Sequence, residues 1–371
     1  MSSNRTLPDY VYLPPAAAQH YAKATRKGRY ELLPSEVEWR DRQKHLAQRG
    51  YLLRPRYFEN WKPSWIGTNI HPHFCEDSII LINYHVIDAT RQRDGKRVAI
   101  KVILNDSDEL HIAEYLASVR GEEHHCVTAL DVLQDPLDAQ RSLLVMPFLR
   151  PYNNPEFQLF GEIVDFVGQM LDGLAFLHRH RIAHRDIASA NVMMDATPIY
   201  PDGYHPVRIH RAPDAIHDTD PLSRIEHPVK YLYVDFGLSV RFPEGARSLV
   251  DGKVGRDTDI PEMSSEKPYD AFKADIYALG NLFDKEIAQR FDNVKFLLPL
   301  IELMKQHEPD LRPSPDELVK MFNQMRALLQ ESALRRRLVL TSEPTYERLF
   351  NDTVAVAREG FSNLKRMVGQ S

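Results

Sequence analysis

Two short stretches carry side chains whose types and spacing suit phosphoryl transfer. In the first, His184–Asn191 reads HRDIASAN, so Asp186 and Asn191 stand five positions apart. In the second, Asp235 opens a DFG triplet that follows a short apolar run. Carboxylate and amide oxygens are ligands for Mg²⁺, and a free carboxylate can accept the proton of an attacking hydroxyl. The two stretches, in this order, predict metal-assisted transfer of a phosphoryl group.

A lysine upstream fits the same chemistry. The strand-like run Val98–Lys101 ends in an ammonium, and Glu114 follows 13 residues later inside an amphipathic stretch, Ser107–Val119. An ammonium that holds phosphates needs a carboxylate to fix its flexible stem. Taken alone, the two residues would be ordinary solvated charges. Together with the downstream loop, they predict an ion pair between Lys101 and Glu114.

The pattern of apolar residues predicts an α+β fold. Strand-like runs span Ser78–Asp88, Arg97–Leu104 and Ser142–Leu149, and Asp94-Gly95 predicts a tight hairpin between the first two. From Gly161 onward, apolar residues recur every three or four positions, which is the helical period. We therefore expect a small antiparallel sheet with one helix, followed by a larger, mainly helical part.

Four stretches organise the chain. Residues 1–70 form an arm with one helix near Val37–Leu53 and two tryptophans, Trp61 and Trp65, which we expect to pack onto the chain itself. Residues 71–149 contain the sheet and residues 150–325 the helical part, with an insertion at about 198–228. Residues 326–371 form a helical tail, with an amphipathic stretch at Tyr346–Val368.

Composition excludes several classes of protein. The 371 residues are 43% apolar and 27% charged, with a net charge of −5 and no basic block, so we expect no nucleic-acid or membrane partner. The two cysteines, Cys75 and Cys126, suit a reducing compartment. No apolar run resembles a signal peptide or a membrane span. We expect an intracellular protein, cytoplasmic or nuclear, whose oligomeric state the sequence leaves open.

The motifs and their order resemble a eukaryotic-type protein kinase domain, from about Ile79 to Met325, roughly two thirds of the chain. The resemblance implies a bilobal fold, ATP and Mg²⁺ as cofactors and a protein substrate. It also implies roles for the residues that match the family's motifs. These are Lys101 on the ATP phosphates, Glu114 as its helix partner, Asp186 as catalytic base, and Asn191 and Asp235 as metal ligands.

The same resemblance extends to supporting positions. Ile260–Glu262 stands where the family's Ala-Pro-Glu closes the activation segment, and Arg312 matches the arginine that pairs with that glutamate. Asp275 matches the helix aspartate that supports the catalytic loop. Met146 lies at the back of the implied adenine pocket, and the N–H of Leu149 would contact adenine. More narrowly, motifs of the arm such as Pro63-Ser64-Trp65-Ile66-Gly67-Thr68 resemble kinase-like proteins expanded in mushroom-forming fungi.

Three departures from the kinase pattern stand out. Where a glycine-rich loop should cover the nucleotide, counting back from Val86 gives Ile79, Leu81 and Tyr84. Ala188 replaces a lysine usual in Ser/Thr-directed members, so the choice of hydroxyl stays open, with Ser/Thr favoured on base rate. The insertion at about 198–228 holds four histidines, which we interpret as parts of a polar surface loop rather than a metal site.

Three functions remain in competition. The first is an active Mg·ATP-dependent protein kinase. The second is a pseudokinase, a scaffold or binding module, which the missing glycines favour. The third is a small-molecule phosphotransferase, which the DFG triplet, the closing Ile260–Glu262 motif and Arg312 disfavour.

Overall fold

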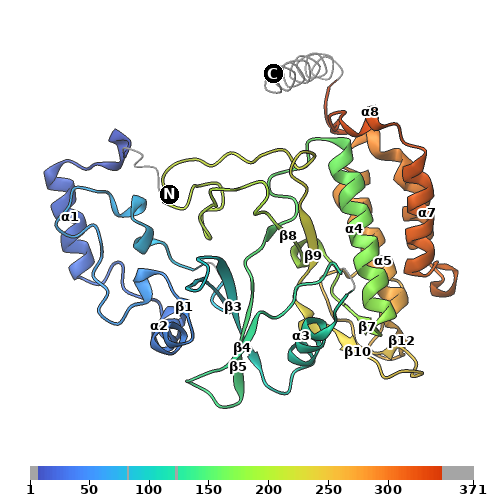
Figure 1. Ribbon diagram of the computed structural model, residues 1–371, viewed down its shortest axis with the longest axis horizontal. Helices are drawn as coiled ribbons and strands as arrows, with labels where there is room; N and C mark the ends of the chain where they lie inside the picture. Colours follow the sequence, from blue (N-terminus) through green and yellow to red (C-terminus); the bar gives the residue numbers. More distant parts are fainter. Residues whose placement is uncertain (1–6, 82, 122–123, 345–371) are drawn as a thin grey trace. The chain divides into compact units, whose positions relative to one another are not determined.

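A computed structural model describes residues 7–81, 83–121 and 124–344, which fall into two compact units (Figure 1). The first unit holds the described residues of 1–118, 128–149 and 196–222, and the second holds those of 119–127, 150–195 and 223–371. A small antiparallel sheet with a packed helix belongs to the first unit, and the longest helices belong to the second. The predicted α+β organisation is confirmed.

Five antiparallel strands form the sheet of the first unit, in the order β1-β2-β3-β5-β4. The predicted hairpin joins β2 to β3: Gly95 has φ +69°, and Asp94 Oδ1 accepts the N–H of Lys96 at 3.1 Å. Such a left-handed position suits glycine because it has no Cβ. The strands are β1 (Tyr51–Leu52), β2 (Val86–Arg91), β3 (Arg97–Leu104), β4 (Asp131–Gln134) and β5 (Arg141–Pro147).

The strand expected at Ser78–Asp88 is wrong in its first part. Among the described residues of this range, only those from Val86 onward are extended and paired, and the strand beside β2 is Tyr51–Leu52, far earlier in the chain. The apolar residues Ile79 and Leu81 pack against the core from irregular backbone instead. Residues 53–85 therefore connect the first two strands of the sheet.

The arm contains two helices, α1 (Pro15–Arg26) and α2 (Pro34–Gln48), where the sequence suggested one. Both tryptophans pack onto the chain itself, as expected. The indole N–H of Trp65 donates to Thr25 Oγ1 and that of Trp61 to Asp77 Oδ2, each at 2.8 Å.

The second unit is built around α4 (Phe160–Arg179), which lies between the three-stranded sheet β6-β8-β9 and helix α7 (Figure 1). Gly168 allows a close approach, because a Cβ there would lie 3.1 Å from the ring of Phe322 on α7. The other helices are α5 (Ala271–Phe283), α6 (Leu298–Met304), α7 (Pro315–Ala327) and α8 (Glu331–Leu334). The short strands are β6 (Arg150–Pro151), β7 (Ile182–Ala183), β8 (Val192–Asp195), β9 (Lys230–Tyr233), β10 (Val240–Arg241), β11 (Leu249–Val250) and β12 (Tyr269–Asp270).

The insertion does not behave as a polar surface loop, which corrects that expectation. Residues 196–222 belong to the first unit, and His205 is only 1% exposed. Apolar side chains anchor the segment because burying them removes their surface from water. The buried ones are Ile199, Tyr200, Ala212, Ala215 and Ile216.

Two further expectations concern the C-terminal stretch and membrane-spanning helices. The amphipathic stretch at Tyr346–Val368 lies outside the described residues. Within the described ranges, none of the helices has the length and hydropathy needed to cross a bilayer.

Candidate active site

The loop between β7 and β8 brings two of the predicted site residues together. The side-chain amide of Asn191 donates to Asp186 Oδ2 at 2.7 Å and to the backbone oxygen of Asp186 at 2.9 Å. Both residues are largely buried, at 9% and 2% exposed. The five-residue spacing thus closes a small loop that fixes the aspartate.

Helix α5 holds this loop in place. Asp275, 1% exposed, accepts the backbone N–H groups of His184 at 2.7 Å and of Arg185 at 2.8 Å. Arg185 has φ +63°, a conformation that costs free energy for a residue with a Cβ. Two charge-assisted hydrogen bonds offset that cost. The supporting role expected of Asp275 is confirmed.

His184 is a packed residue of the loop. It is fully buried, its Nδ1 lies 3.3 Å from the N–H of Asp186, and its Nε2 lies 3.1 Å from the carbonyl oxygen of Val234. Burial lowers the pKa of His184, so the ring is neutral at pH 7. With Nδ1 accepting and Nε2 donating, the ring ties the loop to the strand that leads to Asp235.

The third predicted side chain, Asp235, is positioned by a pair of antiparallel strands. Strand β8 pairs with β9, and the N–H of Val234 donates to the carbonyl oxygen of Asn191 at 3.0 Å. Asp235 then turns the chain with φ +65°. Asn191 and Asp235 therefore stand at the same end of two paired strands. The amide oxygen of Asn191 accepts no hydrogen bond from the described part of the chain, which fits a metal ligand.

The segment after Asp235 returns to the catalytic loop at Gly255 and Arg256. The backbone N–H of Arg256 donates to Asp186 Oδ1 at 2.6 Å, and its guanidinium Nε lies 3.6 Å from Asp186 Oδ2. Gly255 has φ +96°, and a Cβ there would lie 2.7 Å from the backbone oxygen of Arg185. Only glycine permits this approach. Sequence reasoning missed Arg256, which is about 70 residues from Asp186 in the chain.

A buried ion pair closes the segment. Arg312 is 1% exposed and binds Glu262 through two nitrogens, at 2.5 and 2.8 Å. Two parallel hydrogen bonds of this kind fix both position and orientation. The pairing expected of Arg312 with the closing motif is confirmed.

The partner of Lys101 differs from the sequence-based assignment. Lys101 Nζ lies 2.6 Å from Oε1 of Glu109, while Glu114 is exposed. Both glutamates lie on α3 (Asp108–Ser118), five residues apart, which separates them by about 140° around the helix axis. The buried face of α3 includes Glu109, so Glu114 points elsewhere. The assignment of Glu114 is corrected to Glu109.

The residues predicted for adenine belong to the first unit, as Lys101 does. Met146 on β5 pairs with Ala99 of β3, two residues from Lys101, and Leu149 is 8% exposed just before the second unit begins. Asp186, Asn191 and Asp235 all belong to the second unit. Each unit therefore carries part of the predicted site.

A hollow of about 210 Å³ lies beside the catalytic loop within the second unit. Ala188 and Ser189 line it from the loop, and Arg256 lines it from the following segment. On its far side, Asn281 Nδ2 donates to Asp257 Oδ2 at 2.7 Å. The hollow therefore offers hydrogen-bonding groups next to Asp186.

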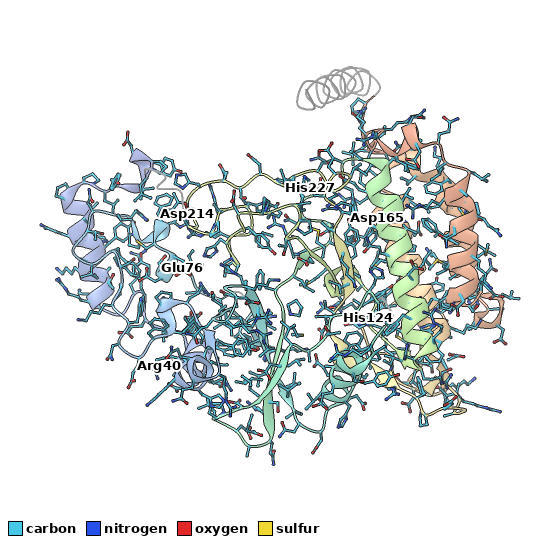
Figure 2. The ribbon with its side chains drawn as sticks, viewed as in Figure 1. Arg40, Glu76, His124, Asp165, Asp214 and His227 are labelled. Atoms are coloured by element: carbon cyan, nitrogen blue, oxygen red, sulfur yellow. The ribbon has the colours of Figure 1, made fainter. Side chains whose placement is uncertain are left out.

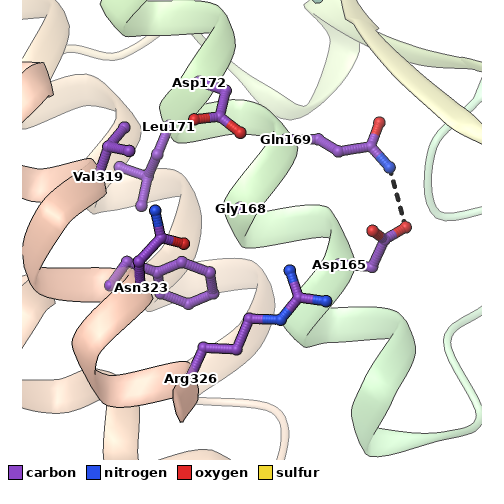
Figure 3. A pocket seen from close by; sticks show the side chains of 9 residues that line it. Asp165, Gly168, Gln169, Leu171, Asp172, Val319, Asn323 and Arg326 are labelled. Atoms are coloured by element: carbon purple, nitrogen blue, oxygen red, sulfur yellow. Dashed lines mark hydrogen bonds between the residues drawn. The ribbon is translucent and has the colours of Figure 1, made fainter.

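A smaller hollow of about 140 Å³ lies between α4 and α7 (Figure 3). In it, Gln169 Nε2 donates to Asp165 Oδ2 at 2.8 Å, and burial raises the pKa of Asp165. The predicted catalytic, nucleotide and metal residues are absent from its lining. We therefore place no catalytic function there.

Comparison with known proteins identifies a family for this chain. A family model described as protein kinase domain matches residues 84–291, which is more than half of the chain. No curated protein matches the chain.

Proposed function

This chain belongs to the protein kinase domain family, and on that premise we propose that it transfers the γ-phosphate of Mg·ATP to a protein hydroxyl, with serine or threonine favoured on base rate. The observation that carries the proposal is the setting of Asp186. Its two oxygens accept hydrogen bonds from Asn191 and Arg256, and its loop is held by Asp275. A carboxylate has about four acceptor positions, so Asp186 can still accept a substrate hydroxyl.

The remaining roles follow from the chemistry of each group. Asn191 through its amide oxygen and Asp235 through its carboxylate would hold magnesium, while Lys101, fixed by Glu109, would hold phosphate oxygens. Bound Mg²⁺ supplies positive charge that stabilises the transferring phosphoryl group. The backbone around Met146 and Leu149 would contact adenine. Asp186 accepts the hydroxyl proton of the substrate.

Arg256 places a cation beside Asp186, where the usual lysine of this loop is replaced by Ala188. Ala188 stands where a lysine is usual, so the loop offers no ammonium beside Asp186. The guanidinium of Arg256 lies 3.6 Å from Asp186 Oδ2 and lines the same hollow as Ala188. A positive charge at this point would stabilise the negative charge that develops on the transferring group.

A protein substrate is favoured over a small molecule. The pair between Arg312 and Glu262 fixes the end of the activation segment, and the hollow beside Asp186 is built partly from that segment.

The finer kinship with kinase-like proteins of mushroom-forming fungi rests on the motifs of the arm. We also propose that the chain divides into four parts at residues 70, 149 and 325, except that residues 196–222 belong to the first unit.

One observation favours the alternative, a pseudokinase scaffold. The connection between β1 and β2, residues 53–85, contains a single glycine, Gly67. A nucleotide-covering loop needs glycines because only a bare backbone can approach phosphates closely. The missing glycines affect the affinity for nucleotide, whereas the setting of Asp186 affects the transfer step.

The test measures ADP release from millimolar Mg·ATP with a mixed protein and peptide acceptor. We expect the purified chain to release ADP and Asp186→Asn to reduce the rate at least about a hundredfold, because the variant loses the proton acceptor. Retained ATP binding in the variant, measured by calorimetry, shows that the site is intact.

Equal background rates in both proteins would reject the kinase proposal. ATP binding without turnover would then support a nucleotide-binding scaffold, and absence of both would support a scaffold that does not use ATP. Turnover on small hydroxylated compounds alone would point to the phosphotransferase.

A further inference from the structure

A cavity in the first unit is unrelated to the transfer chemistry. Its volume is about 350 Å³, and none of Lys101, Glu109 and Met146 lines it. The walls come from three segments that are distant in the chain: the arm near Leu52–Phe58, strands β2 and β3, and the segment 196–222. Figure 2 labels Glu76, which lies in the connection between β1 and β2 and also lines the cavity, and Asp214, which lies on the segment 196–222. A cavity built by three segments has walls that local sequence does not dictate.

Three buried nitrogen donors in the lining make no hydrogen bond: Arg54 Nε, Arg97 Nη1 and His205 Nε2. Arg54 is 8% exposed and His205 1%. A buried polar group without a partner costs free energy comparable to a lost hydrogen bond. Arg54 Nε lies 3.2 Å from Asp88 Oδ1 in an ion pair, so Arg97 Nη1 and His205 Nε2 are the two donors that still need an acceptor.

The tautomer of His205 follows from its neighbours. Its Nδ1 accepts the backbone N–H groups of Val207 at 3.2 Å and of Arg208 at 2.9 Å. The proton of the neutral ring must then lie on Nε2, which is a donor. The nearest carboxylate oxygen, Oε1 of Glu76, is 3.8 Å away, beyond hydrogen-bonding distance.

Arg54 and Arg97 differ in how far nearby carboxylates neutralise their positive charge. Arg54 forms ion pairs with Asp88 at 3.2 Å and Glu76 at 3.3 Å, and these carboxylates raise its pKa although burial acts to lower it. Burial lowers the pKa of Arg97, and the attraction of the Asp88 carboxylate does not reverse the effect. Arg97 is therefore the cation of the cavity that lacks sufficient negative charge nearby.

Apart from Thr90, the rest of the lining is apolar and suits the body of a small molecule. The guanidinium carbon of Arg97 also lies 5.8 Å from the centre of the Phe148 ring. The apolar lining residues are Leu52, Leu53, Pro55, Phe58, Pro206 and Pro213.

We propose that this cavity binds a small organic anion, a carboxylate with a flat apolar body, whose oxygens accept from Arg97 and His205. A monoanion fits better than a dianion, because Asp88 and Glu76 already face the cavity and would repel a second negative charge. The proposal is independent of phosphoryl transfer, since it concerns binding alone.

The test uses isothermal titration of the full chain with benzoate, its neutral analogue benzamide, and phenyl phosphate. We expect benzoate to bind with a Kd of about 1 mM, phenyl phosphate more weakly, and benzamide at least about tenfold more weakly. Arg97→Gln should weaken benzoate about tenfold or more. The matched control, Arg93→Gln, removes an exposed arginine of the same hairpin and should leave the Kd unchanged.

A second variant keeps the proposal testable if Arg97→Gln fails to fold. Thr90 is exposed and lines the cavity opposite Arg97, so Thr90→Phe should obstruct the site while leaving its charges and the core intact. Loss of benzoate binding in this variant supports the cavity as the site. Equal binding of benzoate and benzamide, no saturable heat, or unchanged affinity in both Arg97→Gln and Thr90→Phe would overturn the proposal.

Discussion

At the scale of single residues, the catalytic loop is defined by what converges on Asp186. The side-chain amide of Asn191, five residues later in the chain, donates to it, and so does the backbone N–H of Arg256, from the segment that ends at Glu262. Because Asp275 fixes the backbone on the other side, the carboxylate has little freedom to rotate. Such preorganisation is what lets a carboxylate act on a substrate hydroxyl without first rearranging.

The proposed role of Arg256 predicts a kinetic effect. Arg256→Gln should lower kcat about tenfold, a modest loss because the guanidinium is 58% exposed and screened by water. The KM for ATP and the thermal midpoint should stay unchanged, and Arg256→Lys should restore part of kcat. The exposed Arg247 of the same segment provides the control variant, Arg247→Gln. A parallel fall in thermal midpoint and kcat would instead indicate a structural role.

Residues close in sequence were predictable, whereas those that depend on helix phase or on distant contacts were not. Asp186 and Asn191 share one loop, so their meeting follows from their spacing. Choosing between Glu109 and Glu114 requires knowing which face of α3 is buried, and the short helix presents apolar residues on more than one side. No sequence signal marks the contact between Arg256 and Asp186, because it depends on the path of the whole segment from Asp235 to Glu262.

At the scale of elements, the arm is held by a buried ion pair at the start of α2. Glu36, 1% exposed, accepts two hydrogen bonds from Arg56 at 2.8 and 2.9 Å, and further ones from the N–H of Leu33 and the hydroxyl of Tyr57. Burial acts to raise the pKa of Glu36, but these bonds hold it below its usual value. The helix start and the loop after β1 are thereby joined.

Glu36→Gln should lower the free energy of unfolding by about 3 kcal/mol at pH 7, because Arg56 is left buried without a counter-charge. A carboxyl whose pKa is lowered on folding stabilises fully above its unfolded value, about 4.3, and loses that contribution as pH falls through the folded value. The difference between wild type and variant, measured by urea unfolding, should therefore shrink below about pH 4.

The neighbouring Glu38 provides the control. Its side chain is 59% exposed and pairs with Arg42 at 3.2 Å, so Glu38→Gln should change stability by less than about 1 kcal/mol. A difference for Glu36→Gln that stays constant from pH 7 to pH 3 would contradict the assigned pKa direction.

Strand β1 was not predicted from the sequence, for a reason that lies in its length and pairing. Tyr51–Leu52 is only two residues long, and its pairing with Arg91 and Thr90 joins segments about 40 residues apart. Alternating patterns identify strands of four or more residues, so a two-residue strand carries no local signal. The long helix α4, by contrast, shows its period over five turns, and the expected start at Gly161 lies one residue from its true start at Phe160.

At the scale of the whole molecule, the chain leaves the second unit after β8 and returns to it before β9. In between, residues 196–222 complete the first unit, where they bury His205 and help to enclose the 350 Å³ cavity. The N–H of Leu222 donates to the carbonyl oxygen of Ile199 at 2.9 Å, so the two ends of the insertion meet. A long segment with adjacent ends can be removed without stretching the strands that flank it.

Replacing residues 201–220 by a short Gly/Ser linker therefore tests what the insertion stabilises. Amides of β2, β3 and residues 53–58 should lose protection against hydrogen–deuterium exchange, because their packing partners are gone, while α4 and α5 should keep theirs. Benzoate binding should disappear, since one wall of the cavity is removed. A matched linker exchange in the exposed turn around Gly245 should change neither readout. Uniform loss of protection in both units would show that the insertion supports the entire fold, and unchanged protection would show that its contacts contribute little to the first unit.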